Sequence, residues 1–581
     1  MCLVEGLKVE VTSISIKRSV DELRNSSGNG AQNNADMKMY NALLNYADID
    51  VGLLPVVLRR QALAYIKMEM FENSFSCVDR AIKIKKDDTL SFFIRGIIYA
   101  AQNNAEKAEA DIEKGVKLAK KDTKMLCAAA TMCKALKLYD KSVEILNRAV
   151  QLDSNSNDCL VLRSNVFLEL LRYDDAVSDI SRAIELNPGD AKLWIERGAI
   201  YRKLKRYEEA KKEFTHAIEL APNVAEYFAE RGVLYAITKN YNKAIIDLNH
   251  SIELDPDSLF GRAMRGFVEF MAKQYDAALA DFSRTIDINS EFFFGWLYRG
   301  QIHRLLKKYR EAIDDLTHVI ELKPDSVEAL THRGRAYAAL EMFENAVNDY
   351  TLAFDLKPDN IALLDYRAKA YIRLHRFEHA VSDLNCAIER NPNQATYFVH
   401  RGEAMHWLGY FERALSDFDR ALALDKDQFR DICLNKGLVL SYLQQYPESL
   451  EVYQEGLRLF DSDIDGYYTS LVYNIAVVQS RWKGHRNAKM EIDRARNTLH
   501  SHAESSEGSA NYGLGGLAAL AGDDELALHY LKSAVQLLDA AVVWAKYDIA
   551  WDNLRNDSRF QSLITESSRV KLADNPNALS C

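Results

Sequence analysis

Residues 187–222 decide the fold, and they read NPGDAKLWIERGAIYRKLKRYEEAKKEFTHAIELAP. Moved forward by 34 residues, this stretch meets a second version of itself, APNVAEYFAERGVLYAITKNYNKAIIDLNHSIELDP, at 221–256. One column of small residues keeps this register without a gap through eleven units: Ala62, Gly96, Ala130, Ser164, Gly198, Gly232, Gly266, Gly300, Gly334, Ala368 and Gly402. A one-residue insertion then precedes a twelfth unit at Gly437. A fixed period of this length predicts a tandem repeat array rather than a globule with a single core.

Each unit is predicted to form two amphipathic helices. Residues 191–204 carry apolar side chains at helical spacing, and residues 207–220 repeat that pattern. The small side chain at Gly198 lets the two helices approach closely, and a second small column faces it from the second helix: Ala176, Ala210, Ala244, Ala278, Ala312, Ala346, Ala380 and Ala414. Proline ends many units, because it cannot continue a helix but is tolerated in the following turn.

These columns resemble the tetratricopeptide repeat (TPR) family over roughly residues 55–540. The resemblance implies an all-α solenoid, a right-handed superhelix of about 12–14 helix-turn-helix units. It also implies a concave groove, lined by the first helix of each unit, that binds a protein or peptide partner. Catalysis is not implied, so the chain is expected not to be an enzyme.

Six segments are predicted along the chain. They are a disordered N-terminal segment (1–36), an N-terminal capping helix (37–54), a TPR array of twelve units (55–462), two divergent TPR-like units (463–540), C-terminal capping helices (541–568) and a flexible tail (569–581). Terminal caps are expected because the last repeat of a solenoid has no neighbour to cover its apolar face.

Arginine stands just before the small column in nine units: Arg95, Arg163, Arg197, Arg231, Arg265, Arg299, Arg333, Arg367 and Arg401. An acid follows sixteen residues later in every case: Asp111, Asp179, Glu213, Asp247, Asp281, Asp315, Asp349, Asp383 and Asp417. Units without the arginine also lack the acid. The pairing predicts a partly buried, bidentate ion pair between the two helices of a unit. The alternative is a basic stripe for an acidic ligand, and the matched acids favour the structural interpretation.

Composition and net charge argue against several classes of ligand and site. The net charge of -10 argues against a nucleic-acid backbone as the main ligand. No apolar run is long enough to span a membrane, and the eight scattered cysteines lack metal-binding spacing. No catalytic motif, cofactor site or metal site is predicted. A cytoplasmic or other intracellular location is expected, with the cilium as a variant of it.

Aromatic and basic residues at positions that the family's geometry turns toward the groove are the predicted partner-binding site. They are Phe260, Met264, Phe267, Met271, Phe294, Tyr298, Arg304, Arg335, Tyr366, Lys369, His400 and Trp407. Exposed aromatic and methionine clusters are typical of binding hot spots. The alternative is that these rings fill the tighter inner radius of the superhelix as core.

A non-enzymatic scaffold or adaptor is therefore the predicted function. Two alternatives stay open: a targeting or regulatory subunit of an enzyme complex, and a structural component of a large assembly such as a ciliary axoneme. A carboxylate clamp for chaperone tails is disfavoured. Asn435 and Asn474 fall in one such column, but the companion positions Leu434, Leu438 and Ser470 are poorly suited to holding a carboxylate.

Overall fold

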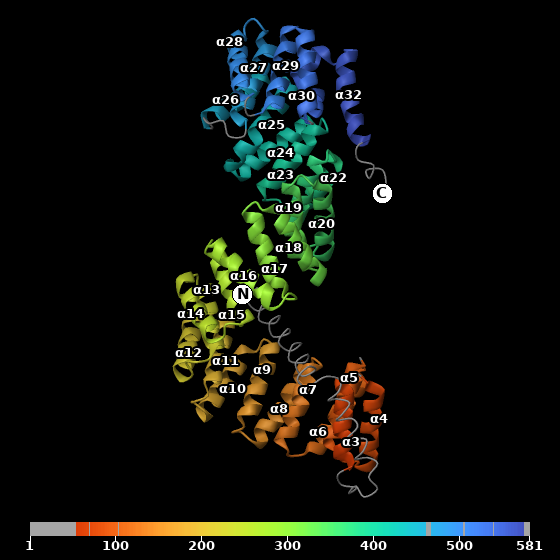
Figure 1. Ribbon diagram of the computed structural model, residues 1–581, viewed down its shortest axis with the longest axis vertical. Helices are drawn as coiled ribbons and strands as arrows, with labels where there is room; N and C mark the ends of the chain where they lie inside the picture. Colours follow the sequence, from red (N-terminus) through yellow and green to blue (C-terminus); the bar gives the residue numbers. More distant parts are fainter. Residues whose placement is uncertain are drawn as a thin grey trace. The chain divides into compact units, whose positions relative to one another are not determined.

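The computed structural model describes residues 54–68, 70–102, 104–459, 466–503, 506–538 and 540–573. The predicted N-terminal segment 1–36 lies outside the described residues, and so does the predicted capping helix 37–54 apart from its last residue. Within the described ranges the chain is helical and has no strand, which confirms the all-α prediction (Figure 1). The chain divides into two compact units, residues 1–308 and 309–581.

The described part of unit 1 is a series of seven helical hairpins followed by one further helix. Its elements are α3 (Leu54–Lys67), α4 (Phe71–Ile84), α5 (Thr89–Ala101), α6 (Ala105–Ala119), α7 (Thr123–Ala135), α8 (Tyr139–Leu152), α9 (Asn157–Glu169), α10 (Tyr173–Leu186), α11 (Ala191–Lys203), α12 (Tyr207–Leu220), α13 (Ala225–Ile237), α14 (Tyr241–Leu254), α15 (Leu259–Met271), α16 (Tyr275–Ile288) and α17 (Phe293–Leu305). Each odd-numbered helix packs against the even-numbered helix that follows it, from α3 to α16.

Over its described residues, unit 2 begins with one helix, continues with six hairpins and ends in a different helical arrangement. Its elements are α18 (Tyr309–Leu322), α19 (Val327–Ala339), α20 (Phe343–Leu356), α21 (Ala362–Arg373), α22 (Phe377–Arg390), α23 (Ala395–Trp407), α24 (Phe411–Leu424), η1 (Lys426–Gln428), α25 (Phe429–Tyr442), α26 (Tyr446–Leu459), α27 (Tyr467–Lys483), α28 (Lys489–His502), α29 (Glu507–Ala521), α30 (Asp524–Leu537), α31 (Ala540–Tyr547), η2 (Ile549–Leu554) and α32 (Ser558–Ala573). The additional residue of the twelfth repeat lies in its first helix, because α25 has 14 residues where α23 has 13.

The small column sets how closely the helices of a hairpin approach. A Cβ added at Gly198 would lie 2.5 Å from Cε1 of Phe214, and one added at Gly402 would lie 2.6 Å from Cε1 of Phe418. Both rings are fully buried in the core of their hairpins. The glycine therefore makes room for a large ring on the second helix, and the added packing contacts stabilise the hairpin.

A left-handed residue reverses the chain at each helix-helix turn between α7 and α24 that precedes a second helix. From Lys137 to Gly409, the residue two positions before each second helix has a φ between 57° and 78°. In the α13–α14 turn, Lys239 adopts this conformation, and the next amide, Asn240 N–H, donates to the Tyr235 carbonyl at 2.8 Å. This is the αL termination that usually selects glycine, yet eight of these nine positions carry a side chain.

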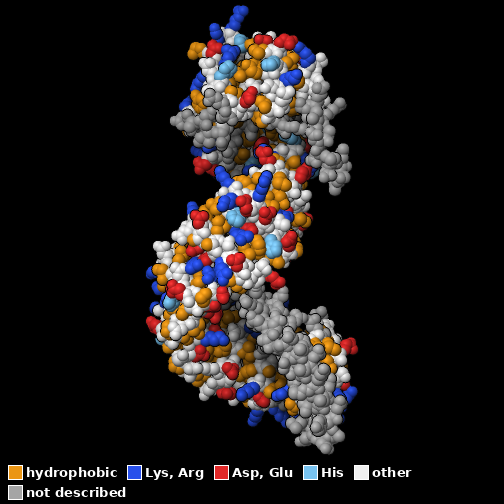
Figure 2. Space-filling model, viewed as in Figure 1, with side chains coloured by type: hydrophobic (Ala, Val, Ile, Leu, Met, Phe, Trp, Pro, Cys, Tyr) orange, Lys and Arg blue, Asp and Glu red, His pale blue; other side chains and the backbone are white. Residues whose placement is uncertain are grey.

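In both units, successive first helices contact one another, as α13 does α15 and as α25 does α27. Successive second helices make sparser contacts. The first helices therefore lie on the inner side of the local curvature in each unit. As a result, their side chains that face away from the second helices lie close together. Figure 2 shows that side chains of both charge signs are interspersed with apolar ones over the visible face.

The C-terminal elements cover the end of the array. Trp551, Leu554 and Phe560 are fully buried and pack in one cluster with α27, α29 and α30. The helix α32 continues to Ala573, so the first five residues of the predicted flexible tail are helical. Residues 574–581 lie outside the described residues. No helix in the described ranges has the length and apolar character needed to cross a membrane.

Candidate partner-binding site

Arginines of the arginine column form bidentate ion pairs with acids of the acid column. Arg231 donates from Nε and a terminal nitrogen to the two carboxylate oxygens of Asp247, at 2.8 and 2.9 Å. The pair Arg265–Asp281 is closer, with both contacts at 2.6 Å. Arg197 reaches Glu213 at 2.9 to 3.1 Å. Arg299 and Asp315 belong to different units, so their pairing stays a prediction.

Each arginine also donates a hydrogen bond to a side chain earlier in the chain, a contact that the sequence pattern did not indicate. The third guanidinium nitrogen of Arg231 donates to the Thr215 hydroxyl at 3.3 Å, and that of Arg265 donates to Asn249 at 2.7 Å. These partners lie sixteen residues upstream, on the second helix of the preceding hairpin. One side chain therefore joins three helices, and the arginine column ties each hairpin to its predecessor.

The predicted aromatic cluster of unit 1 lies mainly inside the protein. Met264 is 0% exposed and Tyr298 is 2% exposed. The Tyr298 ring is stacked on Phe282 at 5.5 Å and meets Phe267 edge to face at 5.4 Å. Phe294 is buried as well. These contacts are those of core packing, since rings that are this deeply covered offer little surface to a partner.

Other predicted residues of unit 1 retain exposed surface. Met271 is 47% exposed, and Phe260, Phe267 and Arg304 are half-buried. The remaining five predicted site residues belong to unit 2, so a single groove containing all twelve stays a prediction.

In unit 2, the predicted residues are largely engaged by neighbouring side chains. The Arg335 guanidinium lies over the Tyr366 ring at 5.4 Å, and His400 Nδ1 lies 2.6 Å from an Asp365 carboxylate oxygen. Lys369 is exposed. Trp407 is half-buried at the end of α23, and it is the one predicted site residue that lines a large cavity.

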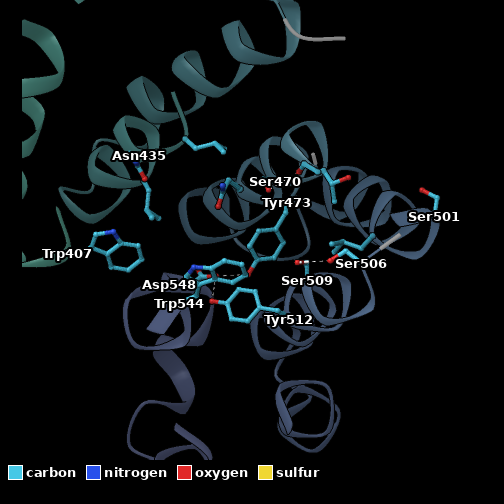
Figure 3. Close-up of a pocket in the computed structure, with 17 residues that line it drawn as sticks. Trp407, Asn435, Ser470, Tyr473, Ser501, Ser506, Ser509, Tyr512, Trp544 and Asp548 are labelled. Atoms are coloured by element: carbon cyan, nitrogen blue, oxygen red, sulfur yellow. Dashed lines mark hydrogen bonds between the residues drawn. The ribbon is translucent and has the colours of Figure 1, made fainter. Parts of the chain in front are cut away.

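This cavity, of about 970 Å³, is formed within unit 2 by residues of the helices α23, α25, α27, α28, α29 and α31 and of the α31–η2 junction (Figure 3). Its lining consists of Trp407, Leu434, Asn435, Leu438, Gly466, Thr469, Ser470, Tyr473, Asn474, Leu499, Ser501, Ser506, Ser509, Tyr512, Gly513, Trp544 and Asp548. Most of these belong to the first helices α25, α27 and α29, whose inner faces adjoin one another.

Asp548 organises one side of the cavity. One carboxylate oxygen accepts hydrogen bonds from the hydroxyls of Tyr473, at 2.8 Å, and Tyr512, at 3.0 Å. The other accepts from the Ala550 N–H at 2.8 Å and caps η2. Figure 3 shows both tyrosine hydroxyls directed at Asp548, with Trp544 beside them. Three hydrogen bonds thus hold the carboxylate in one orientation.

The surroundings of this carboxyl shift several pKa values. Burial raises the pKa of Asp548, and the hydrogen bonds from Ala550, Tyr473 and Tyr512 oppose that rise. Burial, followed by the proximity of Asp548, raises the pKa values of Tyr473 and Tyr512 well above their usual range. Arg555 reaches the Asp548 backbone carbonyl at 3.2 Å, while its guanidinium pairs with Asp552 at 2.8 Å.

Two side-chain amides face the cavity without a partner. Asn435 on α25 and Asn474 on α27 are half-buried, and neither makes a side-chain hydrogen bond to another described residue. Each amide offers both donors and an acceptor, which is the complement of a peptide group. These are the two asparagines that the sequence placed in one column.

Sequence reasoning missed Tyr473, Tyr512 and Asp548, and it assigned Trp544 only to the terminal cap. The available signal was a single acid inside the apolar run VVWAKYDIAW at 542–551. The repeat register did not reveal it, because Asp548 lies after the last hairpin. No group of side chains suited to a metal ion occurs among the described residues.

Two sequence models of the family described as "Tetratricopeptide repeat" match the chain. One matches residues 191–224, and the other matches 123–156, 225–258, 296–326 and 327–360. The matches follow the 34-residue register and fall on helices of the hairpin series. A search of curated proteins found no match.

Solved structures with similar helical arrays include a tetratricopeptide repeat protein from Parabacteroides merdae, with 17% identity over 41% of this chain and 93% of its own, at a TM-score of 0.34. The APC/C hetero-tetramer Cut9-Hcn1 shows 15% identity over 83% and 96% of the two chains, at 0.38. Yeast Tom70 shows 15% identity over 68% and 97%, at 0.31. All three TM-scores are below 0.5.

Proposed function

Because this chain belongs to the tetratricopeptide repeat family, we propose that it is a non-enzymatic scaffold that holds a segment of a partner polypeptide in the cavity of unit 2. Tetratricopeptide repeats support protein-protein interaction, and the proposal adds the place where the partner binds. The observation that carries it is a pair of amides, Asn435 and Asn474, that face a cavity of about 970 Å³ and have no hydrogen-bond partner among the described residues.

The size and lining of the cavity support a polypeptide ligand. Clefts of about 300–1,000 Å³ with apolar walls and a few placed polar groups are typical ligand sites. Here the indole rings of Trp407 and Trp544 provide apolar surface, while Asn435 and Asn474 provide donors and acceptors at two successive first helices. An extended segment crossing those helices would place peptide groups beside both amides. The part of the predicted groove that lies in unit 1, with Phe260, Phe267, Met271 and Arg304, stays a prediction.

The test is selection of a displayed random-peptide library on the full chain, followed by affinity measurement with the enriched peptides. The variant Asn474→Trp fills the cavity with a large ring and is expected to weaken binding at least ten-fold. The matched control is Met490→Trp, which adds the same ring at an exposed position of α28. Failure to enrich any peptide, or equal binding to both variants, would contradict the proposal.

A further inference from the structure

We propose that the cavity of unit 2 recognises a basic side chain of the partner, a lysine ammonium or an arginine guanidinium, with the Asp548 carboxylate as its counter-ion. The inference rests on the proposed function, because it names the chemistry of the segment that the cavity takes. It follows from charge, from the hydrogen bonds of Asp548 and from the rings around it.

The charge of the lining has one sign. Asp548 is the single Asp, Glu, Lys, Arg or His among the described residues that line the cavity. A carboxylate with concave low-dielectric walls around it attracts a cation and repels an anion. The net charge of the whole chain, -10, acts in the same direction at longer range.

Asp548 is anchored without being neutralised. Its three hydrogen bonds come from Tyr473, Tyr512 and the Ala550 N–H, and it forms no ion pair with any Lys, Arg or His whose side chain the structure describes. A carboxylate has about four lone-pair sites, so one acceptor position remains. Burial raises the pKa of this carboxyl, and the hydrogen bonds from Ala550, Tyr473 and Tyr512 offset only part of that rise. A bound cation would supply that compensation.

The rings beside Asp548 fit the rest of a basic side chain. Tyr512 and Trp544 meet edge to face at 5.3 Å, and Figure 3 shows Tyr473, Tyr512 and Trp544 grouped around the carboxylate. Aromatic faces attract ammonium and guanidinium groups. Leu434 and Leu438 line the same cavity and offer apolar contact to an aliphatic stem. Lysine and arginine combine a long stem with a charged end.

A carboxylate ligand does not fit this lining. Binding a carboxylate requires cationic or convergent N–H donors, and no cationic side chain of the described residues lines the cavity. A neutral segment held by the asparagines alone is therefore the alternative to be separated. The two differ in one respect, which is whether binding depends on the ligand's positive charge.

The test uses the full chain labelled with 5-fluorotryptophan and observed by fluorine NMR. The resonances of Trp407 and Trp544 are assigned with single Trp→Phe variants. The probe is n-butylammonium, which reproduces the end of a lysine side chain, and 1-butanol is its neutral isostere. We expect n-butylammonium to shift both resonances saturably, with at least ten-fold higher apparent affinity than 1-butanol.

Two variants test whether the cation binds beside the Asp548 carboxylate in the cavity. Asp548→Asn is expected to reduce n-butylammonium affinity at least ten-fold. Asn474→Lys places a resident ammonium in the cavity and is expected to do the same without touching the capped turn; it remains decisive if Asp548→Asn fails to fold. The control Met490→Lys adds the same charge on the exposed surface of α28 and should bind as the unsubstituted chain does. Melting curves of all variants report folding.

Equal affinity for n-butylammonium and 1-butanol, or undiminished binding to the two cavity variants, would overturn the inference. The outcomes also separate it from the proposed function. Cavity-dependent peptides that need no basic residue would contradict this inference alone. Binding of n-butylammonium without capture of any library peptide would contradict the scaffold site alone.

Discussion

Replacing Arg333 by methionine should loosen the α19–α20 hairpin of unit 2 and its contact with α18. Arg333 donates to the two oxygens of Asp349 at 2.9 and 2.7 Å, and it donates to the Thr317 hydroxyl of the preceding helix, α18, at 3.1 Å. The Asp349 carboxylate has only 3% of its side-chain surface exposed. Methionine keeps the apolar stem but leaves this buried charge without a partner.

The magnitude follows from that uncompensated charge. Removing one member of a buried ion pair costs about 3–5 kcal/mol, whereas replacing both members by apolar residues is often neutral. Arg333→Met should therefore destabilise α19 and α20 by about 3 kcal/mol or more, and Arg333→Met with Asp349→Leu should be milder. Loss of the Thr317 contact should also weaken α18, by about 1 kcal/mol.

Hydrogen exchange measured by mass spectrometry is the suitable assay, because a repeat array does not unfold in one step. About 3 kcal/mol corresponds to a loss of protection of roughly 100-fold in peptides from α19 and α20. The control Arg376→Gln removes an exposed pair, whose 2.6 Å contact to Glu344 is worth about 0–1 kcal/mol. Unchanged exchange after Arg333→Met, or a double variant no milder than the single one, would refute the reasoning.

Three further predictions concern stability. Tyr298→Ala should cost about 3–5 kcal/mol in chemical unfolding, because it empties the centre of a ring cluster; a fully folded variant that has lost only partner binding would contradict core packing. Burial, with Asp281 nearby, raises the pKa of Glu269 from 4.5 to about 7. The unfolding free energy should therefore fall as the pH rises from about 4.5 to about 7, and Glu269→Gln should raise the melting temperature at pH 8 but not at pH 4; equal effects at both would count against it. Lys239→Gly should stabilise the α13–α14 turn by about 0.5–1 kcal/mol, and Gly409→Ala should destabilise its turn by a similar amount, both measured by thermal melting; the opposite signs would show that the left-handed turns are not strained.

Several features followed from the sequence because they depend on residues close together in the chain. The period predicted the hairpins, and the second helix predicted at 207–220 coincides with α12. The glycine column predicted the close approach that the buried Phe214 ring requires. The sixteen-residue spacing predicted the meeting of Arg231 with Asp247, since both lie in one hairpin.

Only the tertiary structure decided which of these side chains make contacts between neighbouring hairpins. The backward hydrogen bond of Arg231 to Thr215 depends on the stacking of neighbouring hairpins. The burial of Tyr298 depends on rings from several helices, and sequence alone left it between core and binding surface. A periodic pattern gives the spacing of such residues but not which of them a neighbour covers.

The cavity of unit 2 was the feature that the sequence predicted least. Its carboxylate, Asp548, meets Tyr473 across 75 residues and Tyr512 across 36, and neither separation is a multiple of the repeat. The sequence determined the hairpins because each one satisfies its own backbone and most of its own core. The tertiary structure decided the cavity because its walls come from separate hairpins and its charge comes from the segment that closes the array.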